Sequence, residues 1–91
     1  PQALRSLHDM LARSSLPRRP AAGPLFVAYG DGDQLVTPAW TAGAVRRACA
    51  VGDRIVVTVE AGRGHTDLQS GPAALAWIGD RFAGVPAPSD C

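Results

Sequence analysis

The stretch Arg54-Ile55-Val56-Val57-Thr58-Val59-Glu60 decides the fold, because its residues are β-branched almost throughout and therefore predict a β-strand. A second strand is predicted from Leu25-Phe26-Val27-Ala28-Tyr29, an apolar run that stops at Gly30. Because this run does not alternate polar and apolar residues, it is typical of a strand covered on both faces. The two runs therefore favour a buried parallel sheet.

Helix signals surround the two strands. Thr37 followed by Pro38 marks a helix start, and Gly52 marks the end of the same helix. Leucines at helical spacing near the beginning of the chain predict another helix, and Pro72 opens a third. The helices predicted in this way cover residues 3–13, about 38–50 and about 72–84.

Each predicted helix has an apolar face. The first helix carries Leu4, Leu7 and Leu11 as a stripe that needs a partner surface. On the last helix we expect Trp77 and Phe82 to be packing residues. Leu75 and Ile78 precede Phe82 at helical spacing. Along one side of the middle helix lie Trp40, Ala44, Val45 and Ala48, opposite Arg46 and Arg47, which face water.

The order helix, strand, helix, strand, helix predicts an α/β fold. Two buried strands joined by a crossover helix run parallel, with a right-handed connection. Two strands alone leave exposed edges, so their composition indicates further neighbours. We therefore interpret the chain as the C-terminal βαβα unit of a larger doubly wound parallel sheet, preceded by one helix. Residues 1–23 form that helix and a Pro-rich connector, and residues 24–91 form the α/β part.

An acid and a base follow the two predicted strands in glycine-rich turns. Asp33 lies three residues after Gly30, and His65 lies five residues after Glu60. Because neighbouring parallel strands end at the same edge, about 4.8 Å apart, the two side chains can meet there. A histidine that acts as a general base needs an acceptor for its Nδ1 proton, and Asp33 can be that acceptor. The pattern predicts the acid and the base of a Ser-His-Asp hydrolase.

Other interpretations of these residues stay open at this point. Asp33 can instead cap the helix that starts at Thr37, which would leave His65 as a plain surface histidine. Asp31 competes with Asp33 for the role of the acid because it lies nearer to the strand end. A calcium loop beginning at Asp31 is excluded, since its twelfth position is Ala42 and not the required Glu.

The nucleophile of such a hydrolase is missing from the sequence. No serine lies in the Gly-x-Ser-x-Gly turn that presents the nucleophile. Ser70 has Leu68 in place of the first glycine, and Cys49 lies on the crossover helix, away from the catalytic edge. We therefore expect this chain by itself to be inactive as a hydrolase.

Composition narrows the class of protein further. The chain has 91 residues, enough for one small domain or a piece of a larger one, and a net charge of +1. Its nine basic residues are all Arg, and its aromatic content is 5%. The sequence therefore shows neither the basic stripe nor the stacking aromatics of a nucleic-acid-binding protein, and we expect no nucleic-acid partner. The sequence contains no signal peptide and no membrane-spanning segment, so we interpret it as processed or as excised from a longer chain. It contains no motif for a metal or a cofactor, and we expect neither to be bound.

Two cysteines, Cys49 and Cys91, indicate the redox compartment. A disulfide between them would join the end of the chain to the crossover helix and close a loop of about 43 residues, worth about 4 kcal/mol in the loop-entropy model. The alternative is two unrelated thiols, with Cys49 a small buried apolar residue. The disulfide is the preferred interpretation, and it implies an oxidising compartment.

The segments around Asp33 and His65 together resemble a known family. The matching segments are Pro24-Leu25-Phe26-Val27 with Gly30-x-x-Asp33-x-x-Val36-x-Pro38, then Ala48-Cys49-Ala50-x-Gly52, then Gly62-x-Gly64-His65, then Ala76-Trp77-Ile78-x-x-Arg81-Phe82-Ala83-Gly84-x-Pro86-Ala87 with Cys91. Their order and spacing resemble the C-terminal portion of the secretory lipases, the Candida antarctica lipase A-like branch of the α/β-hydrolases. The resemblance covers about residues 24–91.

This resemblance implies a function for the parent protein. Asp33 would be the triad acid and His65 the triad base of a secreted serine esterase or lipase that hydrolyses carboxylic esters or triacylglycerols. The serine, the oxyanion hole and most of the cap would lie in the remainder of the parent hydrolase domain, which is the expected partner of this chain. The resemblance also supports secretion and the pairing of Cys49 with Cys91. The alternative from another class is a non-catalytic secreted α/β binding or interaction module.

Overall fold

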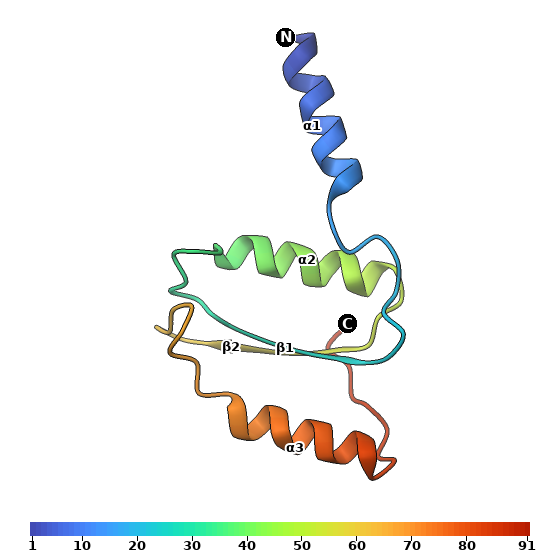
Figure 1. The fold of residues 1–91 in the computed structure, drawn as a ribbon, viewed down its shortest axis with the longest axis vertical. Coiled ribbons are helices and arrows are strands. Elements are labelled where there is room, and N and C mark those ends of the chain that lie inside the picture. Colours follow the sequence, from blue (N-terminus) through green and yellow to red (C-terminus); the bar gives the residue numbers. More distant parts are fainter.

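The computed structural model describes residues 1–91 and contains the five predicted elements in the predicted order (Figure 1). Each begins and ends close to its expected bounds, because local signals such as Pro38 and the β-branched run act within a few residues. The elements are α1 (Gln2–Ser14), β1 (Leu25–Gly30), α2 (Pro38–Ala50), β2 (Ile55–Glu60) and α3 (Gly71–Phe82).

The two strands pair in parallel, as predicted. Leu25 lies opposite Ile55 at one end of the sheet, and Gly30 lies opposite Glu60 at the other. Helices α2 and α3 lie on opposite sides of this sheet, which gives three layers (Figure 1). The chain is therefore a small α/β unit in which both strands end at the same edge.

The core of this unit is small. Ile55 in β2 and Ala48 in α2 are its only buried hydrophobic residues, at 1% and 4% exposure. Trp40 was expected on the same side of α2 as Ala48, but it is 67% exposed, so that expectation is wrong. Trp40 lies near the beginning of α2, whereas Ala48, the buried residue of this helix, lies near its end.

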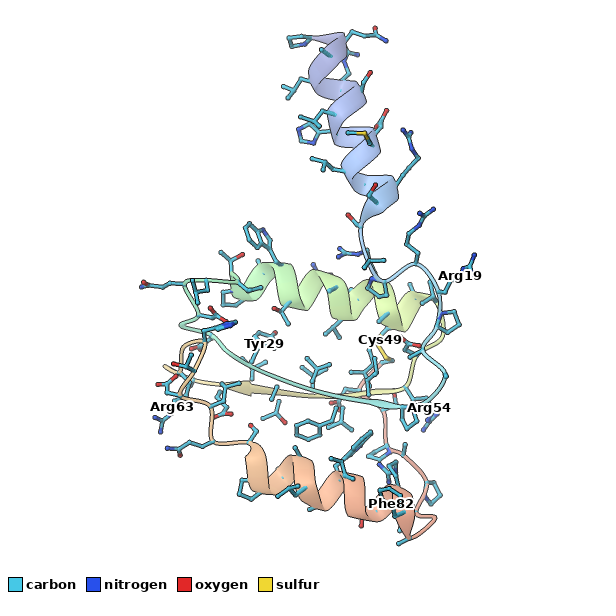
Figure 2. All side chains as sticks on the ribbon, viewed as in Figure 1. Arg19, Tyr29, Cys49, Arg54, Arg63 and Phe82 are labelled. Carbon is cyan, nitrogen blue, oxygen red and sulfur yellow. A yellow bond between two sulfur atoms is a disulfide. The ribbon has the colours of Figure 1, made fainter.

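Helix α3 packs through Trp77, as expected, but not through the rest of the apolar face predicted for it. Trp77 is partly buried, with its ring 6.0 Å from that of Phe26. Phe82 is 90% exposed, so the expectation that it packs is wrong (Figure 2). Leu75 and Ile78 share its outward side, at 71% and 44% exposure. The side of α3 that carries Trp77 lies toward the sheet, where the Trp77 ring packs against Phe26 of β1.

Helix α1 projects away from the α/β unit (Figure 1). None of its residues is buried, and Leu4, Leu7 and Leu11 are about half exposed, at 52%, 45% and 57%. The apolar stripe predicted for this helix is therefore present but has no partner within the chain. None of the helices in the structure has both the length and the apolar character needed to cross a bilayer.

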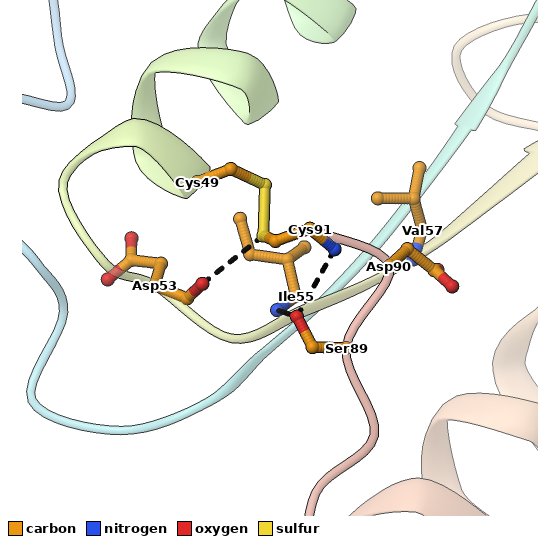
Figure 3. The surroundings of a disulfide bond; sticks show 7 residues. All are labelled: Cys49, Asp53, Ile55, Val57, Ser89, Asp90 and Cys91. Carbon is orange, nitrogen blue, oxygen red and sulfur yellow. Dashed lines mark hydrogen bonds between the residues drawn. A yellow bond between two sulfur atoms is a disulfide. The ribbon is translucent and has the colours of Figure 1, made fainter.

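The C-terminal tail covers the outer edge of β2 (Figure 3). The backbone N–H of Ile55 donates to Ser89 Oγ over 3.2 Å, and the N–H of Asp90 donates to the Ile55 carbonyl over 2.7 Å. A disulfide between Cys49 and Cys91, with Cα atoms 5.3 Å apart, anchors the tail to α2. The predicted pairing is thus confirmed, while the outer edge of β1 carries no strand.

Candidate active site

The predicted acid and base lie at the edge of the sheet where both strands end. The loop of residues 31–37 follows β1, and the loop of residues 61–70 follows β2. Figure 2 shows Arg63, in the second of these loops, at the opposite end of the sheet from Arg54. Parallel pairing therefore places the two loops side by side.

His65 and Asp33 form a hydrogen-bonded pair. Nδ1 of His65 lies 2.9 Å from Oδ2 of Asp33. Because an ionised carboxylate can only accept, Nδ1 carries the proton and the neutral ring keeps a lone pair on Nε2. The contact that parallel strand ends predict is therefore present, and it leaves Nε2 free to accept a proton.

The second oxygen of Asp33 holds the turn before α2. Oδ1 accepts the backbone N–H groups of Leu35 and Val36, over 2.8 Å and 3.0 Å. Thr37 is the N-cap of α2 but makes no side-chain capping bond, so the Asp33 carboxylate orders the approach to this helix. Asp33 therefore binds amides that precede the N-cap and does not itself cap α2, so the capping role weighed for it is not observed.

These hydrogen bonds lower the pKa of Asp33 below its ordinary value. The bond with His65 contributes most, followed by the bond from the Val36 amide, because both stabilise the ionised carboxylate. Asp33 therefore stays ionised at neutral pH. An ionised partner is what a histidine needs if it is to become an imidazolium.

The pair differs in exposure. The Asp33 side chain is 8% exposed, whereas that of His65 is 48% exposed. A hollow of about 330 Å³ adjoins the two residues, so another group can approach the ring. It is lined by Ala28, Tyr29, Asp33, Val36, Thr41, His65 and Leu68.

Asp31, the competing acid, does not contact His65. Its Oδ1 accepts the backbone N–H of Gly62 over 2.6 Å. Two further carboxylates, which sequence reasoning missed, hold the loop of residues 61–70, which we call the histidine loop. Asp67 Oδ1 accepts the N–H of Gly64 over 2.6 Å, and Glu60 accepts from the N–H of Gln69 over 2.8 Å and from the hydroxyl of Ser70. The spacing of acids around a glycine-rich loop is the only sequence signal for these contacts.

No nucleophile of this chain lies against His65. Asp33 is the only side chain that forms a hydrogen bond with the ring. The hydroxyl of Ser70 donates to Glu60, and that of Ser15 donates to the Leu11 carbonyl. Both cysteines are consumed by the disulfide. The arrangement can therefore accept and return a proton, but it does not contain the group that would supply one.

Comparisons with protein-family models, with curated proteins and with solved structures each gave no match. The geometry of the two loops is therefore the basis for any statement about function.

Proposed function

We propose that this chain is the acid-and-base portion of a secreted serine esterase or lipase, and that the serine lies on another part of the same protein. The observation that carries the proposal is the 2.9 Å hydrogen bond between His65 Nδ1 and Asp33 Oδ2 at the carboxyl edge of a parallel sheet. Open α/β sheets bind ligands at this edge.

In the proposed reaction His65 moves a proton in both halves of the cycle. Nε2 takes the proton of the serine hydroxyl while the serine oxygen attacks the ester carbonyl, and His65 then returns the proton to the leaving alcohol. An acyl-enzyme remains. His65 next takes a proton from water as the water oxygen attacks the acyl carbonyl, and returns it to the serine oxygen as the bond between serine and acyl group breaks, which releases the carboxylic acid and restores the enzyme. Asp33 stays ionised throughout and stabilises the imidazolium.

Two further observations support the proposal. The 48% exposure of the His65 side chain leaves room for a serine to reach Nε2. The disulfide between Cys49 and Cys91 fits an oxidising compartment, as a secreted enzyme requires. We propose carboxylic esters or triacylglycerols as the substrate class.

The proposal is tested in the parent protein that contains residues 1–91. Asp33→Asn and His65→Ala should each lower kcat for a p-nitrophenyl ester by about 10⁴-fold or more, because the neutral amide no longer fixes the tautomer of His65 or stabilises its imidazolium, and the Ala removes the base. The matched controls are His8→Ala, which alters an exposed histidine on α1, and Asp80→Asn, which alters an exposed carboxylate on α3. Both controls should keep full activity.

Two results would overturn the proposal. Near-normal hydrolysis in either Asp33→Asn or His65→Ala would remove the pair from the reaction. A parent protein with no ester hydrolysis and no serine in a strand-turn-helix would favour a non-catalytic α/β binding module.

A further inference from the structure

We infer that Asp31 is a positioning residue, which holds the backbone of the histidine loop so that His65 reaches Asp33. This inference rests on the proposed function for its catalytic meaning. The structural part stands on the contacts between the two loops, which can be measured without any substrate.

The first contact is between the Asp31 side chain and the loop. Oδ1 of Asp31 accepts the backbone N–H of Gly62 over 2.6 Å. Apart from the bond between Asp33 and His65, this is the only hydrogen bond that a side chain of residues 31–37 makes with the histidine loop. It therefore fixes the start of that loop from the side on which Asp33 lies.

Backbone contacts bring the same two segments together. The N–H of Asp31 donates to the Glu60 carbonyl over 3.1 Å, and the N–H of Gly32 donates to the Arg63 carbonyl over 2.9 Å. The first of these bonds continues the β1–β2 ladder past the last residues of the strands, and the second joins the two loops beyond it. The loop then turns at Gly62, whose φ of +73° lies in the left-handed region that favours glycine.

The close approach of the histidine loop to β1 depends on Gly30, the last residue of that strand. A Cβ placed on Gly30 would overlap the carbonyl oxygen of Arg63 and lie 2.8 Å from the carbonyl oxygen of Gly64. Any other residue at position 30 would push the histidine loop outward. The absence of a side chain at Gly30 thus lets the histidine loop lie close to β1, and the bond from Gly62 to the Asp31 carboxylate holds it there.

The position of His65 depends on that of Gly62, because the two residues are close in the sequence. His65 lies three residues after Gly62, so a movement of Gly62 and Arg63 is transmitted almost directly to its Cα. The far end of the loop is held separately, because Glu60 binds Gln69 and Ser70. Without the Asp31 carboxylate only backbone bonds join the near end of the histidine loop to residues 31–32, and the ring spends less time on Asp33.

The test uses nuclear magnetic resonance on the 91-residue chain. In Asp31→Ala we expect the downfield resonance of the hydrogen-bonded Nδ1 proton of His65 to broaden or disappear, and the pKa of Asp33 to rise toward its ordinary value. In Asp31→Asn both signals should stay as in the wild type, because the amide oxygen can still accept from Gly62. Asp80→Ala is the matched control, since it removes a carboxylate that makes no side-chain hydrogen bond.

An unchanged Nδ1 resonance and an unchanged Asp33 pKa in Asp31→Ala would overturn the inference. A measurement on the wild type guards against a variant that does not fold. The Gly62 amide proton should exchange slowly with solvent because the Asp31 carboxylate accepts it, and a Gly62 amide that exchanges at the rate of a free amide would overturn the inference as well.

The parent enzyme supplies a separate readout. Asp31→Ala should lower kcat by about tenfold to a hundredfold with little change in KM, which is the cost of slight misplacement. Asp31→Asn should restore most of that loss. If the parent hydrolyses no ester, the proposed function fails while the resonance measurements still decide the role of Asp31. If hydrolysis depends on His65 but the Asp31→Ala signals do not change, only the inference on Asp31 fails.

Discussion

At the scale of single residues, Asp33 connects two structural tasks. One oxygen binds His65, and the other binds the amides of Leu35 and Val36 just before α2. The backbone bonds hold the carboxylate in one orientation, so the oxygen that faces His65 has little freedom. A carboxylate orients a catalytic histidine best when it is itself fixed in this way.

Acid pH should destabilise the fold through two carboxyls. The pKa of Asp33 is lowered, chiefly by His65, and that of Glu60 is lowered, chiefly by the Ser70 hydroxyl and then by the Gln69 amide. Because the folded state favours the ionised form of both carboxyls, they stabilise the fold at pH values above their ordinary pKa values, which are 3.8 for Asp33 and 4.5 for Glu60. That stability is lost as the pH falls through the still lower folded values. Urea unfolding measured from neutral pH downward should therefore show a falling free energy of unfolding below about pH 4.5.

The control for this prediction is the double variant Asp33→Asn with Glu60→Gln. It lacks both carboxyls, so its free energy of unfolding should fall less steeply over the same acid range. Equal slopes for the wild type and the double variant would contradict the argument.

The choice between Asp31 and Asp33 shows where sequence reasoning reaches its limit at this scale. Both residues follow β1 in a glycine-rich turn, and both can reach the same edge of the sheet. The path of the turn decides between them, because it aims Asp31 at the Gly62 amide and Asp33 at the ring of His65. Such a path depends on contacts with the second loop, which residue types alone do not encode.

At the scale of elements, the strands and helices follow local signals closely, whereas the orientation of α3 does not. Two sets of residues at helical spacing compete for the sheet. Leu75, Ile78 and Phe82 form the more apolar set, but Trp77 and Arg81 face inward. The ring of Trp77 packs against Phe26, and the guanidinium of Arg81 lies 5.0 Å from the Trp77 ring centroid. These long-range contacts outweigh the local hydrophobic pattern.

Substitutions on α3 should reveal its orientation. Phe82→Ala should change the free energy of unfolding by less than about 0.5 kcal/mol, because its ring is 90% exposed. Trp77→Ala should cost about 2 kcal/mol, roughly half the figure for a fully buried Trp. Urea denaturation of the two variants measures both values. A larger loss for Phe82→Ala than for Trp77→Ala would mean that the helix packs with its other face.

At the scale of the whole molecule, the outer edge of β2 is covered by the C-terminal tail, whereas the outer edge of β1 has no strand beside it. The tail residues Ser89 and Asp90 satisfy backbone groups of Ile55 and Val57 on the outer side of β2. The outer side of β1 has no such cover. A further strand can therefore pair only with the outer edge of β1, and the predicted neighbour stays a prediction for that edge alone. The tail contacts were not predictable, because an extended Pro-containing segment carries no pairing pattern.

Removing the disulfide should loosen both the fold and this edge. The Cys49→Ala, Cys91→Ala variant should lose about 4 kcal/mol of stability in the loop-entropy model. The amide protons of Ile55 and Val57 should also exchange faster, since the tail that supplies Ser89 and Asp90 is no longer anchored. Thermal unfolding and hydrogen exchange measure the two effects. Unchanged melting and unchanged protection of these amides would show that the tail holds the edge without the disulfide.

The most direct test of the proposed function is covalent labelling of the parent protein with a fluorophosphonate, followed by mass spectrometry of its peptides. We expect one serine outside residues 1–91 to be labelled, in a Gly-x-Ser-x-Gly turn, and the label to be lost in His65→Ala but kept in His8→Ala. Labelling that is equal in all three proteins, or that reaches no serine at all, would contradict the assignment of Asp33 and His65 to an ester-hydrolysing triad.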